Sequence, residues 1–247
     1  MVISPLVCNL KTYVKDTNHA LQIFGTFQFA NDDASQRFLY TMDIKSLYTV
    51  IPHNSGLEAL KYFLNKRSVL DPPTVTLTRL AELVLTLNFT LNAFSFNNEF
   101  YHQVGGVVMG SKMSPNYACL FVGYVEEQIG QQYTGTIPQL HKRYSDDVVG
   151  IACCSRFELE DYIAFVFNFH PALQFTHTIS ETELPFLDIN PGCAFQVTAS
   201  ALPSTTKPLT HTAFSTTIHH IPATAKRASL TASFYALDAS VLTKPTF

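Results

Sequence analysis

Long apolar runs are missing from the sequence, and so is a signal peptide. No stretch of the 247 residues is apolar over the length needed to span a bilayer, and the start, Met1–Pro5, lacks a basic segment and a cleavage pattern. Cysteine is scarce as well: the five present are odd in number and lack metal-ligand spacing, which favours buried reduced thiols over a redox or zinc site. We therefore expect an intracellular protein without a membrane partner.

Basic residues are also few in the part of the chain that carries the motifs described below. Residues 1–190 contain twelve Lys and Arg against eighteen Asp and Glu, a net charge of −6. A protein that grips nucleic acid is expected to be basic, because neutralised phosphates dominate its affinity. Either the basic surfaces belong to segments outside this chain, or the chain binds nucleic acid poorly.

Two adjacent carboxylates, Asp146 and Asp147, lie between two apolar segments in the stretch Arg-Tyr-Ser-Asp-Asp-Val-Val-Gly. Short apolar strands on either side of Ser and Asp predict a tight hairpin, because these side chains bond the local backbone of turns. Two negative charges held at one hairpin tip become tolerable when a cation lies between them. An acidic pair alone is common in solvated turns, but this pattern is typical of a site for a hard divalent ion, above all Mg²⁺.

Two further motifs precede the hairpin. The apolar segment Phe38–Tyr48 predicts a strand that presents a third carboxylate, Asp43, just beyond its buried part. Residues 105–115 form a glycine-rich loop whose backbone can approach a ligand closely, and a helix follows with Ser114 as its cap. A strand-borne Asp, a glycine-rich loop and a Tyr-x-Asp-Asp hairpin, in that order, resemble the palm of reverse transcriptases.

The ordered set MDIKSLYT, GLEALKYFL, MGSKMSPNYACLF, KRYSDDVVG and LPFLDI is similar to the reverse transcriptases of Penelope-like retroelements, relatives of telomerase. The resemblance covers residues 5–189 and implies an RNA-directed DNA polymerase, nuclear if active, that uses an RNA template, a DNA primer and deoxynucleoside triphosphates. It also implies two Mg²⁺ ions, with Mn²⁺ as an alternative, held by Asp43, Asp146, Asp147 and the Ile44 carbonyl. Asp43 and Asp146 would bridge the ions, with Asp147 more peripheral.

The resemblance implies roles for side chains around these carboxylates. Tyr48, five residues after Asp43, is expected under the sugar of the incoming nucleotide, where its bulk would reject a 2′-hydroxyl. On residue type alone it is a half-buried aromatic. The other expected nucleotide contacts are Ile44, Gln103, Met109, Gly110 and Ser111, and the expected template or primer contacts are Tyr144, Leu184, Pro185 and Phe186.

The sequence departs from the reverse transcriptase pattern in lacking the expected general acid. Polymerases of this kind often use a lysine after the hairpin to protonate the leaving pyrophosphate, but no lysine occurs between Arg143 and Lys207. His170 or His177 could replace it, although a histidine beside an aromatic residue is more often structural.

Periodicity predicts an α+β fold. We expect helices over residues 55–67, 114–129 and 155–169, a hairpin over 94–100, and strands over 173–180 and 184–189 in addition to the elements above. The first and last of these helices should begin with capping boxes, Ser55 with Glu58 and Ser155 with Glu158. Their order fits the ferredoxin-like split βαβ sheet of a reverse transcriptase palm, with helices on one face. We divide the chain into a fingers-to-palm lead-in (1–37), the palm (38–190) and a tail (191–247), with partial fingers and no proper thumb.

The tail has an unusual composition, since seventeen of its fifty-seven residues are Ser or Thr and its only acid is Asp238. This composition predicts a disordered segment; the alternative hypothesis is a thumb read out of frame. Two other interpretations of the chain stay open: a catalytically inactive retroelement remnant, and another two-metal palm enzyme such as a nucleotide cyclase.

Overall fold

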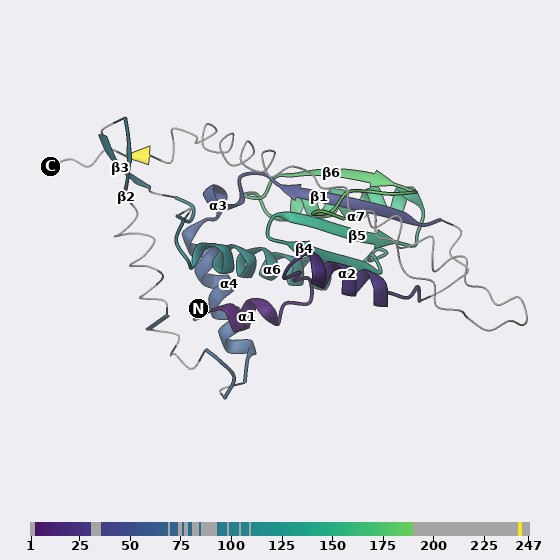
Figure 1. Cartoon of the computed structure of the whole chain (residues 1–247), viewed down its shortest axis with the longest axis horizontal. Coiled ribbons are helices and arrows are strands. Elements are labelled where there is room, and N and C mark those ends of the chain that lie inside the picture. Colours follow the sequence, from purple (N-terminus) through teal and green to yellow (C-terminus); the bar gives the residue numbers. More distant parts are fainter. Residues whose placement is uncertain are drawn as a thin grey trace, which may run out of the picture.

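The computed structural model describes residues 3–30, 36–68, 70–73, 76, 79–80, 84, 93–97, 99–103, 105–108, 110–189 and 242–243. Its helices are α1 (Ser4–Cys8), α2 (Thr17–Thr26), α3 (Leu47–Val50), α4 (His53–Lys66), α6 (Ser114–Gln132) and α7 (Arg156–Phe169). Its strands are β1 (Phe38–Ile44), β2 (Ala93–Phe96), β3 (Glu99–Gln103), β4 (Leu140–Tyr144), β5 (Asp147–Ala152), β6 (Phe175–Ser180) and β7 (Leu242–Thr243). The fold is mixed α/β (Figure 1). None of the described helices is long and apolar enough to cross a membrane.

Four antiparallel strands form the central sheet in the order β4-β5-β1-β6. The strand β1 is central, because it pairs with β5 on one side and with β6 on the other. Along the chain the sheet and its helices follow as β1, α6, β4, β5, α7 and β6, with α3, α4 and the β2–β3 hairpin inserted before α6. This is the split βαβ order that the sequence predicts.

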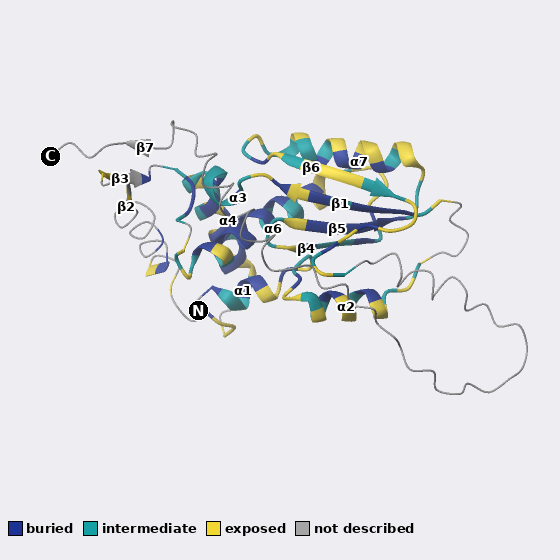
Figure 2. Ribbon diagram, turned by 45° about the horizontal axis from the view of Figure 1, so that its top comes forward, coloured by how far each residue is buried: buried dark blue, intermediate teal, exposed yellow. Residues whose placement is uncertain are grey.

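Helices lie on both faces of the central sheet, which corrects the expectation of helices on one face (Figure 2). On one face, Tyr40 and Met42 of β1 join a core with α6 and α7. On the other face, Leu39 joins Val149 of β5 and Phe24 of α2 in a second core. Because successive side chains of a strand point to opposite faces, β1 is apolar on both. Its continuous apolar sequence is typical of a strand buried on both faces.

The starts of the helices confirm one prediction and correct two. The Ser155 Oγ accepts a hydrogen bond from the Glu158 N–H at 3.3 Å, and the Glu158 carboxylate accepts one from the Ser155 N–H at 2.8 Å, so α7 begins with the expected capping box. Helix α4 begins at His53, two residues before the expected start, and no side chain caps it. Ser114 is the first residue of α6 and not its cap, because Met113 occupies the cap position; the Ser114 hydroxyl donates to the Val108 carbonyl.

Two short segments complete the description. The strands β2 and β3 form the expected hairpin, with Asn97 at the turn in a left-handed conformation (φ 51°), and β7 pairs with β3. The strand expected over 184–189 is replaced by a tight turn, in which Phe186 and Ile189 exchange two backbone hydrogen bonds around Leu187 (φ 54°). The tail lies outside the described residues except for β7, so its expected disorder stays a prediction.

Candidate active site

The β4–β5 hairpin presents Asp146 and Asp147 as the sequence predicts. Its last cross-strand pair is Tyr144 with Asp147, which leaves Ser145 and Asp146 as a two-residue turn. Ser145 has a φ of 56°, and tight hairpin turns of this length need such a conformation in at least one central residue. Asp146 therefore lies at the tip of the hairpin, and Asp147 begins β5.

The strand β1 brings Asp43 to the same end of the sheet. Asp43 lies opposite Asp147 on β5 and opposite Thr176 on β6. The N–H of Ile44 donates to the Asp146 carbonyl at 3.2 Å, which fixes the turn against the end of β1. The Ile44 side chain is buried, so only its backbone can face a ligand. The structure thus brings the carboxylates of two separate motifs to one end of the sheet.

The surroundings of Asp43, its burial first and the charge of Asp146 second, make it harder to ionise. Burial raises the pKa of Asp43, the nearby charge of Asp146 adds to the rise, and the Lys45 ammonium opposes it. A divalent cation between Asp43 and Asp146 would stabilise both ionised carboxylates and so lower the pKa of Asp43 again. Among the described residues, however, no three His, Cys, Asp or Glu side chains are gathered closely enough to hold a metal ion. The two carboxylates that would bind a cation most directly are therefore Asp43 and Asp146, which interact electrostatically. Asp147 is the neighbouring carboxylate, opposite Asp43 in the sheet.

Tyr48 lies in α3, directly after β1, and its side chain is half-buried. Burial raises its pKa, a hydrogen bond with the Ser145 side chain opposes the rise, and the charge of Asp146 adds a smaller increase. Tyr48 is therefore a half-buried aromatic that also adjoins the acidic turn. Its expected contact with a nucleotide sugar and its role as a gate stay predictions.

The glycine-rich loop is fastened to the Tyr48 segment. The Val107 N–H donates to the Tyr48 carbonyl at 2.6 Å, and His53 Nε2 lies 2.8 Å from the Gly106 carbonyl. Gly106 has a φ of 72°, and a Cβ there would lie 2.6 Å from the carbonyl oxygens of Tyr48 and Thr49. Glycine is the residue that permits both this conformation and this approach. The loop and Tyr48 therefore hold one another in place.

The other expected nucleotide contacts differ in their exposure. Gly110 is exposed at a φ of 101°, so its backbone is open to a ligand. Ser111 is half-buried, and its Oγ accepts a hydrogen bond from the Met113 N–H at 3.2 Å. Gln103 is buried, and its amide donates to the Gly105 carbonyl at 2.7 Å, which braces the loop from within. Met109 falls outside the described residues.

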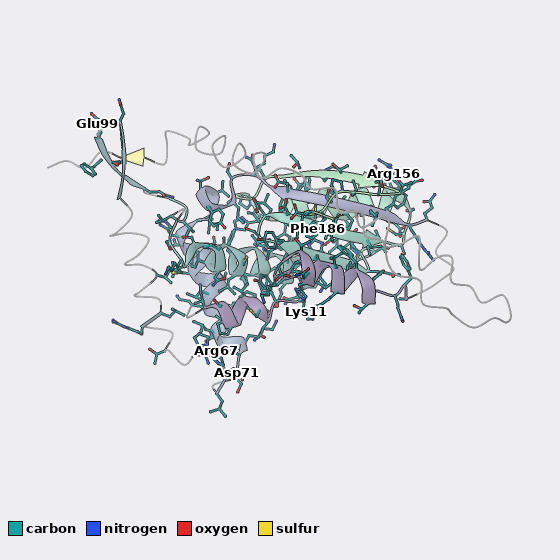
Figure 3. All side chains as sticks on the ribbon, in the orientation of Figure 1. Lys11, Arg67, Asp71, Glu99, Arg156 and Phe186 are labelled. Carbon is teal, nitrogen blue, oxygen red and sulfur yellow. The ribbon has the colours of Figure 1, made fainter. Side chains whose placement is uncertain are left out.

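The expected template or primer contacts are only partly exposed. Tyr144 ends β4 and is 37% exposed. Leu184 and Phe186 (the latter labelled in Figure 3) are buried in the same core as Phe24 of α2. Phe186 packs edge-on against Phe24 with the ring centroids 6.3 Å apart. Both side chains therefore support the turn over residues 186–189 from inside, and their expected contacts with template or primer stay predictions. Pro185 between them is exposed.

The two histidines considered as general acids lie in different surroundings. His170 packs edge-on against Phe121, and burial lowers its pKa, as is typical of a structural histidine. His177 is exposed and packs edge-on against Phe167, with the two ring centroids 5.3 Å apart. It lines a cavity of about 200 Å³ at the acidic end of the sheet, together with Asp43, Asp147 and Pro185. Of the two, His177 is the one that lies near the carboxylates.

A buried ion pair below the acidic turn was missed in the sequence. Arg143 is 0% exposed, and its Nε donates to the Glu126 carboxylate at 2.7 Å. The signal was present in the spacing of α6, since Glu126 lies on the same helical face as the buried Val122 and Ile129. A carboxylate on an apolar helical face requires a partner. That partner is Arg143, the basic residue directly before the Tyr-x-Asp-Asp motif.

Comparison with protein-family models and with curated protein sequences finds no match. Solved structures do match. The apo telomerase of Candida tropicalis truncated from its C-terminal domain matches with a TM-score of 0.58 at 13% identity, over 76% of this chain and 42% of that chain. The telomerase of Candida albicans in complex with the TWJ fragment of telomeric RNA matches with a TM-score of 0.55 at 9% identity, over 76% of this chain and 35% of that one.

The chain has a reverse-transcriptase-like fold. At these identities the similarity concerns the fold alone, and the chain spans less than half the length of the telomerases that it matches. Within this reverse-transcriptase-like fold, the three carboxylates lie at one end of the central sheet, beside Tyr48 and the glycine-rich loop.

Proposed function

We propose that the chain is the polymerase domain of a retroelement reverse transcriptase of the Penelope-like type, which copies RNA into DNA. The observation that carries the proposal is the β1–β5 register, in which Asp43 lies opposite Asp147 with Asp146 at the adjoining turn. The telomerase-like fold supports a nucleic acid polymerase, and the ordered sequence motifs support the narrower assignment.

The carboxylates are the proposed metal ligands. Asp43, Asp146, Asp147 and the Ile44 carbonyl would hold two Mg²⁺ ions, which when bound lower the pKa of the primer 3′-hydroxyl and neutralise charge on the leaving pyrophosphate. The elevated pKa of Asp43 beside Asp146 supports this, because a cation removes the repulsion that causes part of it.

The residues around the carboxylates would place the substrates. Tyr48 lies under the sugar of the incoming deoxynucleotide and excludes a 2′-hydroxyl by its bulk. The exposed backbone of Gly110 approaches the nucleotide, and Pro185 contacts the primer strand across the cavity. In this arrangement positioning carries most of the catalysis, as is usual for phosphoryl transfer.

A second candidate is a catalytically inactive remnant of such an element. The observation that favours it is the net charge of −6 over residues 1–190, because a polymerase needs cationic surface for its template and primer. A remnant would keep the fold and its carboxylates without extending a primer.

Primer extension by the purified chain separates these candidates. We expect extension of a DNA primer on an RNA template with Mg²⁺ and deoxynucleoside triphosphates, and a loss of about 100-fold or more in Asp147→Asn. The matched control is Asp71→Asn, which removes an exposed carboxylate beyond α4, away from the central sheet (Figure 3). Absence of extension by a folded wild-type chain would favour the remnant, and a product formed without primer would favour a cyclase-like enzyme.

A further inference from the structure

The guanidinium of Arg143 binds three residues, two of them in helix α6 and one in the turn of the acidic hairpin. Its Nε and Nη2 donate to the two oxygens of Glu126 at 2.7 and 3.2 Å, a bidentate pair. Its Nη2 also donates to the Cys119 carbonyl at 3.1 Å, and its Nη1 donates to the Ser145 carbonyl at 2.7 Å. The side chain thus links β4 and helix α6 to the turn of the acidic hairpin. The proposed chemistry makes no use of it.

Glu126 is itself held by further partners. The Thr12 hydroxyl donates to Glu126 Oε2 at 2.7 Å, and His141 Nε2 lies 3.5 Å from Glu126 Oε1. The other ring nitrogen of His141 lies 2.8 Å from the Tyr40 hydroxyl. Burial raises the pKa of Glu126, but Arg143 and His141 outweigh it and lower the pKa to about 2. The carboxylate is therefore ionised at neutral pH and a fixed anchor for Arg143.

The backbone of Arg143 is fixed as well. Its N–H donates to the Thr12 carbonyl at 2.6 Å, and its carbonyl accepts from the Val14 N–H at 2.8 Å. These two bonds pair the outer edge of β4 with the segment before α2, where an edge strand would otherwise expose unpaired groups. Arg143 is thus immobilised two residues before the turn residue whose carbonyl it binds.

We propose that Arg143 is a positioning residue: anchored by Glu126, it holds the Ser145 carbonyl and so sets the turn that presents Asp146. The catalytic meaning of this inference rests on the proposed function, whereas the placement of the turn does not. The turn has one other backbone tie to the sheet among the contacts described above, from the Ile44 N–H to the Asp146 carbonyl. Releasing Ser145 should therefore loosen that tie, which makes Ile44 a reporter of the position of the turn.

The test combines Arg143→Met with Glu126→Gln. The double variant leaves no unpaired buried charge, which is the main hazard of changing one partner alone. The amide that replaces the Glu126 carboxylate can still bond to Thr12 and His141. The matched control is Lys142→Met on the same strand, whose ammonium bonds to the Lys11 carbonyl and not to the turn.

Two measurements are made on each variant: hydrogen exchange of the Ile44 amide, and primer extension. In the folded double variant we expect Ile44 to exchange about tenfold faster, the factor of a typical single hydrogen bond, and extension to fall by at least about tenfold. The Tyr40 amide, farther along β1, and the Lys142→Met control should match the wild type.

A folded double variant with wild-type exchange at Ile44 would overturn the proposal, because the pair would then only stabilise the core. If the wild type extends no primer, the proposed function fails, but the exchange at Ile44 still decides whether Arg143 sets the turn. If the double variant does not fold, Arg143→Lys keeps the buried charge without the guanidinium fork. Faster Ile44 exchange in that variant would support the proposal, and unchanged exchange would overturn it.

Discussion

The buried pair of Glu126 and Arg143 predicts how the stability of the fold depends on acid. Burial alone would raise the pKa of Glu126, but the charge of Arg143 and the contacts of His141 lower it from 4.5 to about 2. At about 1.4 kcal/mol per pKa unit, this shift corresponds to roughly 3 kcal/mol of stabilisation. Removing one partner of a buried ion pair typically costs about 3–5 kcal/mol, so the two magnitudes agree.

The sign of the pH dependence follows from the lowered pKa. Because Glu126 ionises more readily in the folded state than in the unfolded state, its stabilisation is complete above the ordinary value of 4.5 and is lost as the pH falls toward about 2. We therefore expect Glu126→Gln to lower the free energy of unfolding by roughly 3 kcal/mol at neutral pH. Near pH 2 most of this difference should be lost, because about half of the wild-type carboxyl is then protonated in the folded state and nearly all of it in the unfolded state.

Urea unfolding followed by circular dichroism, repeated at several pH values between about 2 and 7, measures this difference. The control is Glu160→Gln, since Glu160 pairs with Arg156 at 2.9 Å on the exposed surface of α7 and should change stability by at most about 0.5 kcal/mol. A Glu126→Gln cost that is the same at all pH values, or absent at neutral pH, would refute the reasoning.

Three further predictions concern backbone and capping. Gly150→Ala should lower the free energy of unfolding by about 1–3 kcal/mol, because the added Cβ would clash with the Tyr40 ring. Thermal unfolding measures this, with Gly130→Ala as the control because a Cβ there meets no atom within 4 Å; equal midpoints for the two variants would contradict the prediction. Gly106→Ala should reduce primer extension, because the φ of 72° and the two carbonyls at 2.6 Å force the loop to shift; wild-type extension would contradict this. Ser155→Ala should cost about 1 kcal/mol in urea unfolding through loss of the α7 cap, and an unchanged midpoint would show that the cap is dispensable.

Short-range pattern was sufficient to locate the acidic end of the sheet. The hairpin around Asp146 follows from two short apolar strands and turn-forming residues, and the strand ending at Asp43 follows from its apolar run. The capping box at Ser155 and Glu158 was equally local. In each case the residues that determine the conformation are within a few positions of one another.

Features that depend on distant contacts could not be read in the same way. Leu184 and Phe186 form part of a motif, and only packing against α2 shows that their side chains are buried. Ser114 has the residue type of a helix cap, but α6 begins one residue earlier than that role requires, with Met113 at the cap position. The sequence showed Arg143 only as a residue next to the acidic motif. Its role as an anchor depends on Glu126, which lies seventeen residues earlier on helix α6.

Binding of Mn²⁺ to the purified chain, measured by electron paramagnetic resonance, tests most directly whether the grouped carboxylates form a metal site. We predict that the wild type binds Mn²⁺, that Mg²⁺ displaces it, and that Asp43→Asn and Asp146→Asn each weaken binding by about tenfold or more. Asp71→Asn should bind as the wild type does. No binding by a folded wild type, or equal binding by all four proteins, would contradict a metal site at this end of the sheet.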